Sequence, residues 1–273
     1  MKKTNYVFIV AALLFAAGPL SGLAQNEEKL FEEIRHRGDP PYLLESGWIP
    51  LLNGKNMDGW EYVPNTGQGG WTATPGVVWD ESDGSARLKE VYIAGDRIVN
   101  TIDASKKVAS DIVTTKKFGD AEIYLEFLVA GTSNSGVYVH GLYEIQIVNS
   151  YAKDSLNPTN TCGSIYDFDQ KVNNEYVGGV SPLVRAERPA GQWQSYHILF
   201  KAPRYDNEGK KISNARFVRV LQNGVVIHTN VERKASTRAA MKIKEAAENP
   251  LMFQGNHGTI AYRNIYIRPI KIQ

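Results

Sequence analysis

The stretch that decides the fold runs from Gly119 to Ser150 and reads GDAEIYLEFLVAGTSNSGVYVHGLYEIQIVNS. Turn residues from Gly131 to Gly136, and again at Gly141-Leu142, divide it into three short runs. Within each run apolar and polar residues alternate, as they do in strands that bury one face. The stretch therefore predicts three consecutive β-strands that share one sheet.

The alternation gives this predicted sheet a polar face. Solvent-facing strand positions more often carry Lys, Thr, Ser and scattered charge, whereas this face has two carboxylates, a histidine, an amide and two tyrosines. Its residues are Tyr124, Glu126, Tyr138, His140, Glu144 and Gln146. Such a set favours a ligand site. However, one wet face is usual in antiparallel sheets, and aromatic–polar pairs stabilise sheets without any ligand, so both interpretations stay open here.

The first residues predict export. Lys2 and Lys3 precede an uncharged apolar run from Val7 to Ala17, and small residues precede a predicted cleavage after Ala24. That run is shorter than the roughly 20 residues that a membrane-spanning helix needs. We therefore expect a signal peptide over residues 1–24, no membrane span, and a periplasmic or secreted mature protein.

Charge and cysteine content exclude several classes of function. Of 31 basic residues the signal removes two, which leaves 29 against 29 acidic residues. A balanced charge favours neither nucleic acid nor an anionic membrane as a partner. Cys162 is the only cysteine, so an intrachain disulfide and a cysteine metal cluster are excluded, and a buried, inert thiol is expected.

The remaining segments continue the β pattern. Short strands recur between turn residues, and Asn223-Gly224 is the strongest hairpin signal. Residues 26–37 and 232–248 predict short helices, and the long irregular stretch 151–182 predicts a functional loop. We expect an all-β sandwich with small helical additions, divided into a signal peptide (1–24), an N-terminal helical extension (25–46) and one β domain (47–273).

Several segments resemble one known family in the same order along the chain. LLNGKNMDGW, ending at Trp60, resembles its opening motif, and Asn134-Ser135-Gly136-Val137-Tyr138 followed by Tyr143-Glu144-Ile145-Gln146-Ile147 resembles its centre. Cys162-Gly163-Ser164-Ile165-Tyr166, Gly191-Gln192-Trp193-Gln194 and Gln254-Gly255-Asn256-His257-Gly258 resemble its later motifs. The family is the 3-keto-disaccharide hydrolases, also described as 3-keto-glucoside 1,2-lyase and 3-keto-2-hydroxy-glucal hydratase domains.

The resemblance implies a concanavalin A-like jelly roll of two antiparallel sheets, with a sugar site on the concave sheet. It also implies a carbohydrate substrate, a 3-keto-glucoside, and a sugar 3-oxidase that supplies this substrate. His140 stands where many relatives carry arginine.

A 3-keto sugar permits cleavage without the usual carboxylate pair. The ketone acidifies the proton on the adjacent ring carbon, so a base can remove it, the aglycone is eliminated, and water adds to the resulting glucal. Glu126 or Glu144 would be the base, and His140 or His257 would protonate the leaving group. The expected substrate-binding residues are Tyr124, Asn134, Tyr138, Gln146, Tyr166 and Gln254.

Three further points stay open. A divalent metal on Glu and His ligands would polarise the ketone, but no ligand spacing establishes one, so no cofactor is certain. The same fold also serves non-catalytic carbohydrate binding. A conventional glycosidase would need a second carboxylate near Glu144, which Glu126 would have to supply because Gln146 is an amide. His197 and Arg263 are expected to be structural.

Overall fold

The structure is a computed structural model that describes residues 46–67, 69–74, 76–79, 88–90, 97–100 and 109–272. These residues belong to one compact unit, Pro41–Gln273, and a second unit, Met1–Pro40, lies outside them. The signal peptide over 1–24 and the helix over 26–37 therefore stay predictions. Within the described ranges, no helix is long and apolar enough to cross a membrane.

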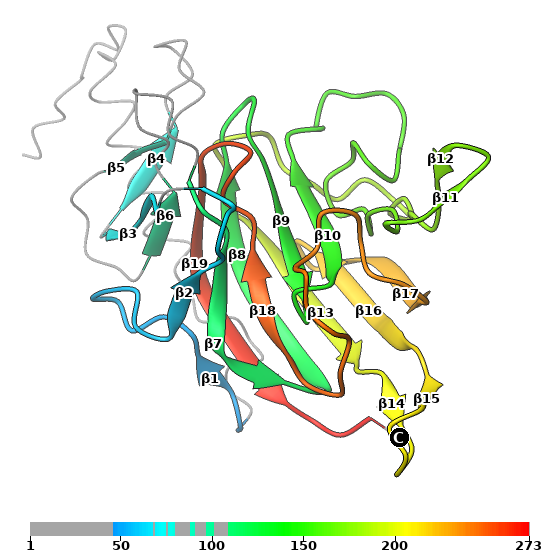
Figure 1. Ribbon diagram of the computed structural model, residues 1–273. Coiled ribbons are helices and arrows are strands. Elements are labelled where there is room, and N and C mark those ends of the chain that lie inside the picture. The colour runs from blue at the N-terminus through cyan, green and yellow to red at the C-terminus, as the bar shows by residue number, and fades with distance from the viewer. Residues whose placement is uncertain are drawn as a thin grey trace, which may run out of the picture. The chain divides into compact units, whose positions relative to one another are not determined.

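Alternating apolar residues build two antiparallel sheets that lie face to face, the five-stranded one in front in Figure 1. The larger sheet has the order β17 (Val225–Arg233), β16 (Ala215–Gln222), β13 (Gln194–Lys201), β8 (Ala121–Val129), β19 (Ile260–Pro269), β6 (Arg97–Asn100) and β3 (Trp71–Thr74), and β1 (Ile49–Pro50) also pairs with β19. The smaller sheet has the order β10 (Tyr143–Val148), β9 (Asn134–Val139), β18 (Asn249–Phe253), β7 (Ile112–Phe118) and β2 (Trp60–Tyr62). Three two-stranded ribbons complete it: β4 (Val77–Trp79) with β5 (Leu88–Glu90), β11 (Lys171–Val172) with β12 (Glu175–Tyr176), and β14 (Arg204–Tyr205) with β15 (Lys211–Ser213).

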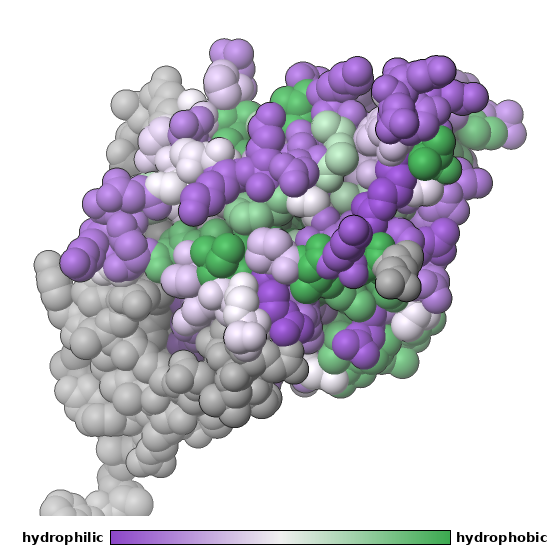
Figure 2. Space-filling model, turned by 90° about the horizontal axis from the view of Figure 1, so that it is seen from below, coloured by the Kyte–Doolittle hydropathy of each residue, from purple (hydrophilic) through white to green (hydrophobic). Residues whose placement is uncertain are grey.

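The core fills the space between the two sheets. Along β13, buried and partly exposed residues alternate without interruption, as expected for a strand with one face inward. Phe253 of the five-stranded sheet stacks on Tyr262 of the eight-stranded sheet with ring centroids 4.2 Å apart. Seen from below, the described surface mixes hydrophilic residues with small apolar patches (Figure 2), which is ordinary for a protein surface. The predicted jelly-roll sandwich is confirmed.

The prediction that residues 119–150 form one sheet is wrong. β8 pairs with β13 and β19 in the larger sheet, whereas β9 and β10 belong to the smaller one. The turn at Gly131 therefore carries the chain from one layer of the sandwich to the other. Alternation along each strand is correct, but parity says nothing about which strands become neighbours.

The predicted helix over 232–248 is also wrong. β17 runs on to Arg233, and the chain then turns without forming a helix. Backbone amides of this segment donate to other loops: that of Thr237 to the carbonyl of Leu142, and that of Arg238 to the carbonyl of Asp167. These lateral partners replace the i→i−4 bonds on which a helix depends. Elsewhere the described residues contain strands, turns and loops but no helix.

The hairpin expected at Asn223-Gly224 is confirmed, since it joins β16 to β17 with positive φ angles of 51° and 82°. The long stretch 151–182 is ordered and carries β11 and β12, which lie out beyond β10 (Figure 1). Its residues Gly163 to Tyr166 run along the free edge of β10: the amide of Gln146 donates to the carbonyl of Ser164, and that of Tyr166 to the carbonyl of Glu144. This segment extends the smaller sheet past its last strand.

Candidate active site

The outer face of the five-stranded sheet carries the polar residues of β9 and β10. Val137 of β9 and Ile145 of β10 point into the core. Their sequence neighbours Tyr138 and Glu144 therefore point to the opposite face of the sheet. Tyr138 and Glu144 are direct cross-strand partners. Here the alternation predicted from the sequence is confirmed.

A glycine makes room for the carboxyl group of Glu144. Gly136 lies two residues before Tyr138 on β9, opposite Gln146. A Cβ atom built on Gly136 would lie 2.2 Å from Oε1 of Glu144 and 2.9 Å from its Cδ. The carboxyl group therefore lies over the bare backbone of Gly136, and a Cβ atom at position 136 would displace it.

Gln254 and Asp111 extend this polar face across β18 and β7. The side-chain amide of Gln254 donates to the hydroxyl of Tyr138 at 3.3 Å, and its buried Oε1 has no hydrogen-bond partner. The carboxylate of Asp111 accepts a 2.8 Å bond from the amide of Gly255. Asp111 did not figure among the predicted site residues, because a lone aspartate before a strand carries no pattern, and its partner lies 144 residues away.

Burial controls the ionisation of both carboxyl groups. Glu144 is 3 % exposed, and burial raises its pKa to about 8 against the opposing hydrogen bond from Tyr138 and the positive charges of Arg238 and Arg233. Burial likewise raises the pKa of Asp111, while its bond from Gly255 and the charge of His257 lower it. Burial, and after it the charges of Glu144 and Asp111, raise the pKa of Tyr138 well above its ordinary value, so its phenol stays protonated as a donor.

Two loops close the β10 side of this face. Tyr166 follows the core residue Ile165 and lies beside Glu144 across the extended edge. Nη2 of Arg238 donates to the hydroxyl of Tyr166 at 2.7 Å, and the same guanidinium lies 4.2 Å from the ring centroid of Tyr176. Tyr166 was predicted, whereas Arg238 lies within the segment 232–248 that was predicted to be a helix, and it was missed.

The structure places three other predicted residues near these groups. The amide of Asn134 donates to the carbonyl of His257 at 3.2 Å, and His257 is exposed, with its ring on the side chain of Asn256. Gln146 shares the outer face with Glu144, but its amide donates to the carbonyl of Thr159 at 3.0 Å. Gln146 therefore anchors the 151–182 loop in this structure.

Glu126 and Tyr124 are not part of this face, which corrects the predicted constellation. They lie on β8, and Nε of Arg263 donates to Oε2 of Glu126 at 2.5 Å. The hydroxyl of Tyr124 donates to Oε1 of the same carboxylate at 2.8 Å. Since Leu125 and Phe127 point into the core, Glu126 faces away from it, on the far side of the sandwich from Glu144. The structural role expected for Arg263 is confirmed.

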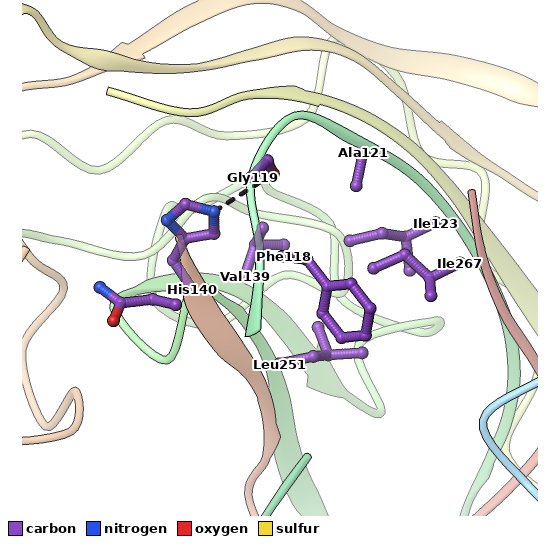
Figure 3. A pocket seen from close by; sticks show the side chains of 9 residues that line it. Phe118, Gly119, Ala121, Ile123, Val139, His140, Leu251 and Ile267 are labelled. Carbon is purple, nitrogen blue, oxygen red and sulfur yellow. Dashed lines mark hydrogen bonds between the residues drawn. The ribbon is translucent and has the colours of Figure 1, made fainter. Parts of the chain in front are cut away.

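His140 is also elsewhere. It is the first residue of the turn after β9, with φ of 59°, so strand parity does not apply to it. Its ring packs 4.9 Å from that of Phe200, and Nε2 bonds the carbonyl of Gly119 at 3.3 Å, beside a small apolar cavity (Figure 3). Burial lowers its pKa to about 4, and Nδ1 has no hydrogen-bond partner. Glu126, His140 and Glu144 thus do not form one site.

The other expectations about single residues hold. Cys162 is buried, and burial raises the pKa of its thiol to about 11. Nε2 of His197 lies 2.6 Å from Oε1 of Glu122, as expected of a satisfied sheet histidine. Among the residues that the structure describes, no three His, Cys, Asp or Glu side chains gather as metal ligands.

Comparison with known proteins agrees with this architecture. A crystal structure of a candidate glycosyl hydrolase from Parabacteroides distasonis is similar, with a TM-score of 0.54, 26 % identity, and coverage of 82 % of this chain and 84 % of that one. A second structure described in the same way, from the same organism, has a TM-score of 0.50 at 18 % identity and covers 85 % of this chain and 98 % of its own, which supports the fold alone. No curated protein matches the chain. The model of one family, the 3-keto-alpha-glucoside-1,2-lyase-like domain, matches residues 47–268, and the chain belongs to that family.

Proposed function

We propose that the protein is an exported enzyme that cleaves 3-keto-glucosides by proton abstraction, elimination and rehydration. The observation that carries the proposal is the carboxyl group of Glu144, which is buried over Gly136 with a pKa raised to about 8. A general base with a pKa near the working pH combines an available ionised form with a strong drive to take a proton. Family membership supplies the substrate class.

In the first step Glu144 takes the proton from ring carbon 2, next to the ketone at carbon 3. The electron pair of that C–H bond moves onto the ketone oxygen and forms an enolate. Tyr138 donates its hydroxyl to the ionised Glu144 carboxylate. Once Glu144 carries the proton, this donor can turn to the new oxyanion, and the amide of Gln254 holds the phenol in place.

In the second step the enolate electrons return, a C1–C2 double bond forms, and the aglycone leaves carbon 1. The leaving oxygen takes a proton from the pair Asp111 and His257, which act on each other electrostatically. Water then adds across the double bond, with its oxygen on carbon 1 and a proton on carbon 2. The net result is hydrolysis without a carboxylate nucleophile.

Access to Glu144 requires a rearrangement. A side chain with 3 % exposure cannot meet a sugar ring unless neighbouring groups shift. Tyr166, Tyr176 and Arg238 are the partly exposed side chains beside it, and two of them lie on loops rather than in the sheet body. We therefore assign these residues to the wall that moves when the substrate binds.

Conventional acid–base glycoside hydrolysis is the second candidate. It is favoured by Asp111 and Glu144, two carboxyl groups on one face whose pKa values are both raised. The pair predicted earlier, Glu126 with Glu144, is separated by the sandwich.

One experiment decides between the two. The protein is incubated in D2O with a 3-keto-disaccharide and, separately, with the unmodified disaccharide. The proposal predicts release of 3-keto-glucose with deuterium at carbon 2, because that carbon loses its proton and regains one from solvent. Cleavage that keeps hydrogen at carbon 2 would establish the conventional route. Binding of either sugar without any cleavage would reject both and leave a carbohydrate-binding protein.

A further inference from the structure

The loop after β17 brings a cation to the candidate base. Arg238 lowers the pKa of Glu144 more than any other charged residue does. Glu144 forms no ion pair with it within the described contacts, so the guanidinium acts through space rather than by direct contact. The groups that act on Glu144 come from four places: Tyr138 of β9, Asp111 before β7, Arg233 at the end of β17, and Arg238.

The two arginines differ in how far their guanidinium groups are already buried and hydrogen-bonded. Arg233 is fully buried, stacks 4.1 Å from the ring centroid of Phe168, and donates to the carbonyls of Gly178 and Tyr166. Arg238 is only half-buried. Its Nη2 donates to the hydroxyl of Tyr166 and its guanidinium also bonds Tyr176, which leaves part of its five N–H donors available. Arg233 therefore holds the loop, whereas Arg238 can still bind another oxygen.

The backbone next to Arg238 is held in an unfavourable conformation. Ala239 has φ of 65°, in the left-handed region that L-residues other than asparagine and aspartate rarely adopt. The amide of Met241 bonds the carbonyl of Gly141 and the amide of Ala240 bonds that of Thr237, which fixes the turn. Strained residues of this kind persist where the surrounding structure holds them, and they cluster at functional sites.

We propose that Arg238 is a catalytic residue that binds the oxygen which becomes anionic when the substrate loses its proton. This inference rests on the proposed function, because that oxygen is the ketone oxygen of the reacting sugar. Tyr166 and Tyr176 orient the planar guanidinium, which supplies a positive charge beside the base once this wall has opened for the substrate. Its charge favours the enolate over the neutral ketone, so it lowers the barrier to proton removal.

The test uses Arg238→Met, Arg238→Lys and a charge-matched control on the same loop, Lys242→Met. The side chain of Lys242 is 85 % exposed, and its Nζ lies 3.6 Å from Oδ2 of Asp169. Kojic acid is the probe for binding, since its adjacent enol and carbonyl oxygens resemble the enediolate. Calorimetry measures its affinity, and turnover of a 3-keto-disaccharide gives kcat and KM.

Arg238→Met should weaken kojic acid binding at least tenfold and lower kcat roughly 100-fold or more with a smaller change in KM, as loss of one oxyanion donor does. Arg238→Lys should recover part of both, and Lys242→Met should match the wild type. Equal kojic acid affinity in the wild type and Arg238→Met, or no binding to either, overturns the inference. If binding depends on Arg238 but no keto-glycoside is cleaved, the proposed function fails and the oxyanion site stands.

Discussion

Gly136 offers the sharpest test of the site because its replacement should disturb function far more than stability. Its φ is not positive, so alanine fits the backbone there. The new methyl group would begin 2.2 Å from Oε1 of Glu144 and 2.9 Å from both Cγ and Cδ. Ordinary carbon–oxygen contact needs about 3.4 Å, so the carboxyl group must move by roughly 1 Å.

A shift of about 1 Å in a catalytic group costs roughly 100-fold in rate, or about 2.7 kcal/mol of transition-state stabilisation. The effect on folding should be small. Alanine gains about 0.5–1 kcal/mol over glycine within a strand, which offsets the cost of moving Cγ, Cδ and Oε1 of Glu144. We expect Gly136→Ala to fold with a nearly unchanged Tm and to lose about two orders of magnitude in kcat on a 3-keto-disaccharide.

A double-mutant cycle provides the control. Unfolding free energies are measured for Gly136→Ala, Glu144→Ala and the double variant. Because Glu144→Ala removes the clashing carboxyl group, the alanine at 136 should be more favourable in that background, with a coupling of about 0.5–3 kcal/mol. A folded Gly136→Ala protein with wild-type kcat, or a cycle without coupling, would refute the placement of Glu144 over Gly136.

Three further predictions concern the groups that the structure separates. The pKa of Glu144 is raised from 4.5 to about 8, so the wild-type free energy of unfolding should fall as pH rises from 4.5 to 8, because there the unfolded chain has released the proton and the folded chain has kept it. Glu144→Gln should abolish this slope. Activity should rise with pH toward 8, as the carboxyl group ionises. Glu126→Gln removes the carboxylate partner of Arg263 and should cost about 3 kcal/mol in urea unfolding, with kcat within threefold of the wild type. Burial lowers the pKa of His140 from 6.5 to about 4, so the wild-type free energy of unfolding should drop by about 3 kcal/mol as pH falls from 6.5 to 4. Asparagine tolerates the positive φ at this position, so His140→Asn should fold and lack this loss. The same dependence of unfolding free energy on pH in both proteins would contradict a buried neutral ring.

The sequence predicts which side chains share a face of a strand better than it predicts which strands pair with each other. Alternation correctly places Tyr138 and Glu144 on one face, because the periodicity of a strand is local. It fails for Glu126, because the choice between hairpin and crossover depends on packing with β13 and β19, which lie more than 60 residues further on. It fails for His140, because this residue has a left-handed backbone conformation in the turn after β9, and the alternation ends at Val139.

The residues that were missed share one cause. Asp111 and Arg238 each reach the site through partners that are remote in sequence, and neither belongs to a periodic run. Arg238 lies in a charged segment whose composition resembles an exposed helix, yet its neighbours bond across to other loops. Only the folded chain brings these isolated side chains beside Glu144.

The positions of β18 and β19 have a consequence for how the protein is made. Both are late in the chain, yet each lies inside its sheet, β18 between β9 and β7 and β19 between β8 and β6. The contact between Gln254 and Tyr138 joins residues 116 apart. Closing such long loops is entropically costly, and proteins dominated by distant pairings fold slowly. During synthesis each layer lacks an interior strand until the final segment emerges, so the candidate site is among the last parts of the protein to form.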